Sequence, residues 1–170
     1  MQTIEYKFAD KSSWPRGQWD DEPDKVQWQD KETGLICLAV RNGLHGGWCG
    51  YVGVVEEHPW FKQDYHAHED VEVHGGLTFS DFCVEENKEH GICHVPDEDE
   101  PDNVWWFGFD CAHYYDMSPR DYSSSPLGML NAISSMFDSD VSNIKRGEYR
   151  TLAYVQSEVA RLARQIKAAA

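Results

Sequence analysis

Four titratable side chains follow directly after a strongly apolar stretch of the chain, V-W-W-F-G-F at residues 104–109. Asp110, Cys111, His113 and Asp116 lie within seven residues of one another. An aromatic run of this length is typical of a strand that is buried on both faces. Polar groups placed where a core strand runs out into a loop are arranged as in many binding and catalytic sites. These residues therefore mark the first candidate site.

A second polar turn interrupts another apolar segment, at His74, Gly75 and Gly76. Paired glycines let backbone N–H groups converge on an anion such as a phosphate, and the adjacent imidazole can exchange a proton near neutral pH. A tight turn between two strands, capped by the histidine, explains the same residues without a ligand. We expect this turn and the strand end at residues 110–116 to face one another across a pocket.

The expected pocket is polar and has aromatic walls. Its carboxylates and imidazoles could bind hydroxyls or a base, while tryptophan or tyrosine rings stack on a planar ring. The ligand expected there is a small anionic or nucleotide-like molecule, held without turnover. The predicted ligand-binding residues are His74, Gly75, Gly76, Trp105, Trp106, Asp110, His113 and Asp116.

Two other functions are open. In one, a small hydrolase uses His74 or His113 as its general acid or base, with Asp110 orienting the imidazole, to cleave a phosphodiester or glycosidic linkage. In the other, the acidic segments at residues 20–24 and 97–102 bind and inhibit a basic protein, such as one that binds nucleic acid. A binding protein without catalysis is the main prediction.

Two patterns raise the question of a metal. Cys111 and His113 would share one face of an extended segment, and Cys93 or His94 could complete a zinc site, although the spacings match no zinc module. Residues 66–70, H-A-H-E-D, are similar to the start of the H-x-H-x-D-H signature of metallo-β-lactamase-like hydrolases, but a valine takes the sixth position. We therefore predict no metal or other cofactor, and a solvated histidine-rich loop at residues 66–70.

The chain is strongly acidic, with a formal net charge of -15 over 170 residues. Because affinity for a phosphate backbone comes from Lys and Arg, direct binding to nucleic acid is not expected. A well-solvated surface is the simpler explanation of the charge. The hydrophobic content of 41% is enough to bury a core, so we expect residues 1–170 to form one domain, which could also assemble as a homo-oligomer.

The five cysteines are odd in number and form no C-x-x-C motif. The first residues contain no apolar signal segment, and no stretch approaches the roughly 20 apolar residues that a membrane span needs. We therefore expect a reduced, cytoplasmic protein without a membrane partner, in which most cysteines are buried and unpaired.

Hydrophobic patterns predict a mostly antiparallel sheet followed by helices. Residues 1–24 form an irregular lead-in, residues 127–137 have the apolar spacing of a helix, and residues 148–168 form the C-terminal helix. The predicted fold class is α+β, with the helices packed on one face of the sheet. The expected strands lie at residues 26–29, 35–40, 48–55, 71–73, 77–83, 91–95 and from residue 104 onward.

Four blocks of the sequence are distinctive: V-H-G-G-L-T-F at residues 73–79, G-I-C-H-V-P at 91–96, D-N-V-W-W-F-G-F-D-C-A-H at 102–113, and Y-R-T-L-A-Y-V at 149–155. Together they resemble a group of small uncharacterised proteins encoded by bacteriophages. The resemblance implies a phage accessory protein in the cytosol of a bacterial host. It would sequester a nucleotide signal used in host defence or bind a host protein.

Overall fold

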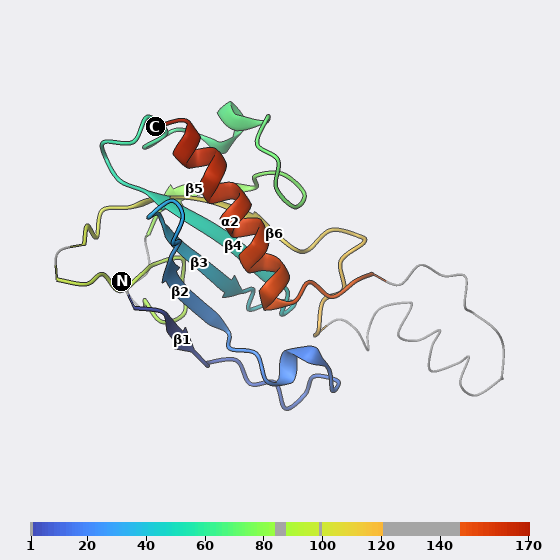
Figure 1. Ribbon diagram of the computed structural model, residues 1–170. Helices are drawn as coiled ribbons and strands as arrows, with labels where there is room; N and C mark the ends of the chain where they lie inside the picture. Colours follow the sequence, from blue (N-terminus) through green and yellow to red (C-terminus); the bar gives the residue numbers. More distant parts are fainter. Residues whose placement is uncertain (1, 84–87, 99, 121–146) are drawn as a thin grey trace, which may run out of the picture.

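The centre of the molecule is a six-stranded sheet in which all neighbouring strands are antiparallel, in the order β1-β2-β3-β4-β6-β5 (Figure 1). The computed structural model describes residues 2–83, 88–98, 100–120 and 147–170. The described strands are β1 (Ile4–Tyr6), β2 (Lys25–Gln29), β3 (Ile36–Arg41), β4 (Trp48–Val54), β5 (Phe79–Phe82) and β6 (Trp105–Asp110). The described helices are the short 3-10 helices η1 (Gln18–Asp20) and η2 (Tyr65–His68) and the α-helix α2 (Leu152–Ala168). The predicted α+β fold is confirmed.

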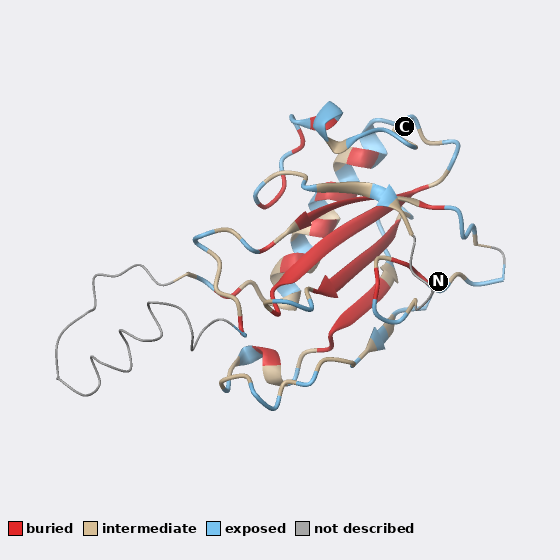
Figure 2. Ribbon diagram, turned by 180° about the vertical axis from the view of Figure 1, so that it is seen from behind, coloured by how far each residue is buried: buried red, intermediate tan, exposed pale blue. Residues whose placement is uncertain are grey.

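The strands β3 and β4 form the middle of the sheet, and every residue of both is buried (Figure 2). Their apolar sequences suit strands that are covered on both faces. The aromatic strand β6 is also held on both edges, by β4 and β5. Gly108 of β6 lies opposite Tyr51 of β4, and a Cβ at this glycine would overlap the tyrosine ring. The glycine therefore admits a neighbouring side chain of the core and not a ligand.

Helix α2 covers one face of β3 and β4 (Figure 1). Four of its buried apolar residues recur every three or four positions, as the sequence predicted: Val155, Val159, Leu162 and Ile166. Ala163 is buried beside them. The Thr151 hydroxyl caps the helix by accepting a hydrogen bond from the Tyr154 N–H at 3.2 Å. The helix therefore begins at Leu152 and not at residue 148, because Glu148 instead forms a parallel bridge with Asp116.

The opposite face is covered by residues 88–96, which two buried side chains of β2 hold in place. Gln27 bonds both backbone groups of Val95, donating to its C=O at 2.9 Å and accepting from its N–H at 3.0 Å. The buried ammonium of Lys25 donates hydrogen bonds to the carbonyl oxygens of Lys88, Gly91 and Cys93. These side chains satisfy the backbone as a neighbouring strand would, so the strand predicted at residues 91–95 does not form.

Two further sequence predictions differ from the structure, and a third is not tested by it. Residues 71–73 are not a strand, because the Glu72 N–H bonds the Gln165 side chain of α2 at 2.9 Å and so docks this segment on the helix. The lead-in is not wholly irregular, since β1 pairs with β2. The helix predicted at residues 127–137 lies outside the described residues. Among the described helices, none has the length and apolar character that crossing a membrane requires.

Cys83 and Cys93 form a disulfide, with their Cα atoms 5.0 Å apart. The expectation of a fully reduced chain is therefore wrong for this pair, because Lys25 holds the segment that carries Cys93 against the sheet. Cys37, Cys49 and Cys111 are free and buried, as predicted for most of the cysteines. Burial raises the pKa of the Cys49 thiol to about 11, which keeps it protonated and unreactive. The cysteines no longer argue for a reducing compartment, and the cytoplasmic location stays a prediction.

Gly50 lies where α2 packs against β4. A Cβ at this position would lie 2.5 Å from Cζ of Phe109 and 2.6 Å from Cγ2 of Val159. We expect Gly50→Ala to lower the free energy of unfolding by about 1–3 kcal/mol, because helix and sheet must move apart to admit the methyl group. Urea denaturation would measure the change. Gly43→Ala is the control, since a Cβ there has no atom within 4 Å, and equal stability of the two variants would contradict this packing.

Candidate functional site

The turn at residues 73–76 packs directly against the loop that follows β6. Gly75 and Gly76 have positive φ angles of 68° and 84°, which glycine adopts at little cost. The Gly76 N–H closes the turn by donating to the Val73 carbonyl oxygen at 2.9 Å. A Cβ on Gly75 would overlap the imidazole of His113. The two turns therefore face one another in direct contact, and the expected pocket does not open between Gly75 and this ring.

His74 lies between α2 and the loop after β6, and both of its ring nitrogens have partners. Its Nδ1 is 2.9 Å from the hydroxyl oxygen of Tyr154, and its Nε2 is 2.9 Å from Oδ2 of Asp116. Its backbone N–H donates to the Glu158 carboxylate at 2.8 Å. Because the residue is also buried, His74 orients its neighbours and has no ring nitrogen directed at solvent.

The carboxylate of Asp116 is fully buried and accepts hydrogen bonds on both oxygens. Besides His74, Oδ2 accepts from the backbone N–H and from Nδ1 of His113, each at 3.1 Å. Oδ1 accepts from Nε of Arg150 at 2.9 Å. Burial by itself would raise the pKa of Asp116, but the hydrogen bonds from His74, Arg150 and His113 outweigh it and lower the pKa. Asp116 is therefore ionised at neutral pH.

The cluster of His74, His113 and Asp116 can orient an imidazole and could hold a metal ion. An ionised carboxylate only accepts hydrogen bonds, so Nδ1 of His113 carries a proton and, in the neutral ring, Nε2 is the basic atom. The His113 side chain is 26% exposed, and the Tyr115 ring stacks parallel to it with centroids 5.2 Å apart. The ligand atoms of the three residues lie within 4.8 Å of one another.

The structure does not bring Asp110, Trp105 and Trp106 into this cluster. Side chains alternate along a strand, and Trp106 is completely buried on the face opposite α2. Asp110, four positions after Trp106, shares that face and accepts a hydrogen bond from the Thr78 hydroxyl at 2.9 Å. Trp105 lies at the edge of the core beneath α2. Asp116 therefore takes the orienting position that the hydrolase alternative gave to Asp110.

The four residues of the alternative zinc site are also separated. Cys93 is committed to the disulfide. His94 is buried on the face opposite α2, where its ring lies 5.7 Å from that of Trp106. Cys111 lies in the core beneath α2, and burial raises the pKa of its thiol. Of the four, His113 alone belongs to the cluster described above.

The histidine-rich loop at residues 66–70 contains two different environments. His66 is exposed, and its Nδ1 lies 2.7 Å from Oδ1 of Asp64. His68 is buried and stacks on Trp60 with ring centroids 3.8 Å apart. Burial lowers the pKa of His68, which keeps its ring neutral. The predicted solvated loop is correct for His66 and wrong for His68, and the two rings are not placed to share a metal.

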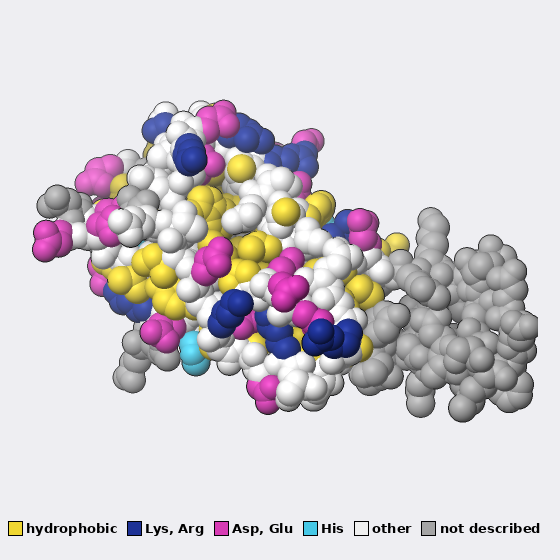
Figure 3. Space-filling view, turned by 60° about the horizontal axis from the view of Figure 1, so that its bottom comes forward, with side chains coloured by type: hydrophobic (Ala, Val, Ile, Leu, Met, Phe, Trp, Pro, Cys, Tyr) yellow, Lys and Arg dark blue, Asp and Glu magenta, His cyan; other side chains and the backbone are white. Residues whose placement is uncertain are grey.

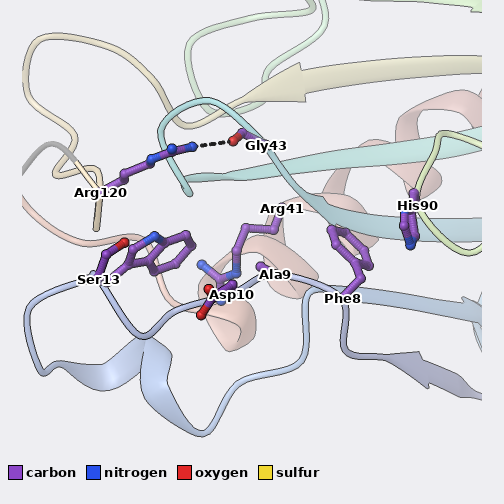
Figure 4. Close-up of a pocket in the computed structure, with 9 residues that line it drawn as sticks. Phe8, Ala9, Asp10, Ser13, Arg41, Gly43, His90 and Arg120 are labelled. Atoms are coloured by element: carbon purple, nitrogen blue, oxygen red, sulfur yellow. Dashed lines mark hydrogen bonds between the residues drawn. The ribbon is translucent and has the colours of Figure 1, made fainter.

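A cavity of about 560 Å³ lies outside the predicted site, between segments that are distant in the sequence (Figure 4). Phe8 and Trp14 come from the lead-in, Arg41 ends β3, His90 comes from the segment over the opposite face, and Arg120 follows β6. The rings of Phe8 and His90 lie 4.5 Å apart at this cavity. Sequence reasoning missed these residues because no local spacing joins them. The sequence feature that could have indicated this cavity is the group of aromatic residues in the lead-in.

Comparisons with known proteins were made for the whole chain. No protein-family model matches it, and neither a curated protein nor a solved structure matches it.

The buried carboxylate of Asp116 predicts a pH-dependent stability. We expect Asp116→Asn to lower the free energy of unfolding by about 3 kcal/mol near neutral pH, because it removes the charge that pairs with Arg150. The folded-state pKa of Asp116 is lowered, so its contribution is complete above the unfolded pKa of about 4 and is lost as the pH falls through the folded pKa. Urea denaturation of both proteins should show their difference narrowing only below about pH 4. A difference that persists unchanged in strong acid would contradict this role.

Proposed function

We propose that this protein binds a small anionic molecule with a planar ring, of nucleotide-like chemistry, in the cavity that Phe8, Trp14, Arg41, His90 and Arg120 line. The observation that carries the proposal is the Arg120 guanidinium at an aromatic-walled cavity, where two of its three nitrogens have no hydrogen-bond partner among the described residues. The ligand class is the one that the sequence suggested, but its place is different. A volume of about 560 Å³ is within the usual range for small-molecule sites.

The anionic part of the ligand would bind Arg120. Its Nη1 donates to the carbonyl oxygens of Gly43 at 3.0 Å and Leu44 at 3.4 Å (Figure 4). Within the described part of the chain, its Nε and Nη2 have no hydrogen-bond partner and no carboxylate pairs with it. The carbonyl groups that hold this guanidinium are neutral, so they do not offset its positive charge. The guanidinium also presents a planar pair of donors, which suits a phosphate or carboxylate.

Arg41 has a different role at the same cavity. All three of its nitrogens donate to protein groups, including Asp24 at 3.1 Å and Glu22 at 3.0 Å. These carboxylates offset its charge, so Arg41 shapes the wall and leaves direct anion binding to Arg120. Its guanidinium carbon lies 5.7 Å from the Trp14 ring centroid, which helps to hold that indole at the cavity.

The planar part of the ligand would lie against the aromatic walls. Trp14 and the Phe8–His90 pair supply the aromatic rings that line the cavity, and the rings of Phe8 and His90 lie next to each other (Figure 4). Stacking of a base on an aromatic side chain contributes about 1–3 kcal/mol and tolerates different bases. Asp10 also lines the cavity, and its carboxylate accepts a hydrogen bond from the Ser12 N–H at 2.9 Å. Aromatic walls together with the Arg120 guanidinium favour a ligand that combines a ring with an anionic group.

The charge of the whole chain favours a small ligand over a nucleic-acid strand. The net charge is -15, and on the described part of the face in Figure 3 the Lys and Arg side chains are interspersed with Asp and Glu and form no continuous stripe. A long polyanion would be repelled by such a surface. Binding without turnover would sequester the ligand, which fits the role that the resemblance to phage proteins implies.

The proposal can be tested by isothermal titration calorimetry, in which adenosine and guanosine monophosphates are titrated into the protein. Adenosine and inorganic phosphate are titrated separately, as probes for the ring and for the anionic group. We expect Arg120→Ala to weaken nucleotide binding about tenfold or more, because a charged hydrogen bond contributes about 1.5–3 kcal/mol. Trp14→Leu should weaken the nucleotide and adenosine but leave phosphate unchanged. Arg16→Ala is the matched control, since Arg16 is 94% exposed and pairs with Asp20. Binding that is insensitive to Arg120→Ala, or no binding of any probe, would contradict the proposal.

A further inference from the structure

We propose that His74, His113 and Asp116 form a binding site for a divalent transition-metal ion of the zinc class. Their potential ligand atoms lie within 4.8 Å of one another. The three residues come from the glycine turn and from the loop after β6, two segments that the fold presses together. This inference is separate from the proposed cavity, because the two sites share no residue.

The distances between the ligand atoms are close to those that a metal requires. Four-coordinate zinc binds histidine nitrogen and carboxylate oxygen at about 2.0–2.1 Å, which places neighbouring ligand atoms about 3.3 Å apart. Oδ2 of Asp116 lies 2.9 Å from Nε2 of His74 and 3.1 Å from Nδ1 of His113. Shifts of a few tenths of an ångström in the rings would therefore be enough to admit an ion between the three atoms, once His113 takes the tautomer in which Nε2 carries the proton and Nδ1 is free to bind the metal.

The groups behind the three ligands suit a metal site. Metal-binding imidazoles are usually oriented by a hydrogen bond at the other ring nitrogen, and Nδ1 of His74 lies 2.9 Å from the Tyr154 hydroxyl. When Nε2 of His74 carries the proton and donates to Asp116, the hydroxyl can donate to Nδ1. When Nε2 binds a metal, Nδ1 carries the proton and the hydroxyl can accept from it. Arg150 holds Oδ1 of Asp116 at 2.9 Å, which leaves Oδ2 as the single oxygen directed at the two imidazoles.

The positive charge of Arg150 opposes a cation, and two features reduce this effect. Glu148 pairs with Arg150 at 2.8 Å, and Arg150 contacts the carboxylate oxygen that faces away from the imidazoles. The carboxylate of Asp116 lies between the guanidinium and the proposed ion. The net charge around the ion is therefore favourable, although less so than it would be without the arginine.

One side of the proposed site is partly exposed. Asp116 and His74 are buried, whereas the His113 side chain is 26% exposed and forms the side of the cluster that solvent can reach. Three protein ligands with room for a water molecule are typical of metal sites that act on a substrate, while structural zinc sites are closed by four protein ligands. The ion would therefore be accessible to small molecules from the side of His113.

Binding of Zn²⁺ and Co²⁺ to the chelator-treated protein tests the inference. We expect calorimetry to show one ion per chain and the Co²⁺ visible spectrum to show tetrahedral coordination without thiolate ligands. His113→Ala should weaken Zn²⁺ binding at least 100-fold, and Tyr154→Phe about tenfold, because loss of an orienting group typically costs 10–100-fold in affinity. The Tyr154 variant keeps all three ligands, so it decides the question if His113→Ala fails to fold.

The matched control is His66→Ala, which removes an exposed histidine whose Nδ1 lies 2.7 Å from a carboxylate oxygen of Asp64. It should leave the affinity for Zn²⁺ unchanged, as should Arg120→Ala at the proposed cavity. No binding to the wild-type protein, equal losses in the His66 and His113 variants, or a thiolate spectrum with Co²⁺ would each overturn the inference. Loss of nucleotide binding in Arg120→Ala with intact Zn²⁺ binding would show that the two sites are independent.

Discussion

The rest of the structure depends on the partners that the buried guanidinium of Arg41 requires. A buried charge is costly unless it is paired and hydrogen-bonded. Arg41 meets this requirement with Asp24 at 3.1 Å, Glu22 at 3.0 Å and the Tyr149 hydroxyl at 3.1 Å. These partners come from the lead-in and from the segment before α2, and the second oxygen of Glu22 bonds the Leu152 N–H at 2.8 Å. One side chain at the end of β3 thus joins the lead-in, the sheet and the start of the helix.

This connection places both candidate sites. Because α2 begins beside Arg41, its first turns bring Tyr154 to the imidazole of His74 and place Arg150, just before the helix, against Asp116. The lead-in, held at the same point, supplies the aromatic wall of the cavity. The positions of the cluster and of the cavity therefore both depend on the contacts of Arg41, although the two sites have no residue in common. Because the two sites are separate, the same small domain can contain buried arginines that pair with carboxylates and, at the cavity, an arginine that binds carbonyl oxygens.

The acidic composition gives the few basic side chains distinct roles. The chain has 15 Lys and Arg residues against 30 Asp and Glu residues. Arg41 and Arg150 pair with buried carboxylates, and the ammonium of Lys25 is surrounded by carbonyl oxygens of the segment that covers the sheet. Arg120 also contacts carbonyl oxygens, but it lies at a cavity rim and has no carboxylate partner among the described residues. Selectivity for an anion would then arise from one local group and not from the overall charge.

The sequence by itself determined the features that depend on neighbouring residues. The apolar runs of β3, β4 and β6 predicted buried strands, the three-and-four spacing predicted α2, and the paired glycines predicted the turn beside His74. The tertiary structure decided which side chains meet. Strand alternation turns Asp110 away and the loop beyond it brings Asp116 to His74, while Arg41, His90 and Arg120 converge from distant segments. It also paired Cys83 with Cys93. Residue type and spacing encode local conformation, whereas these contacts follow from strand order and from the pairing of buried charges across the whole chain.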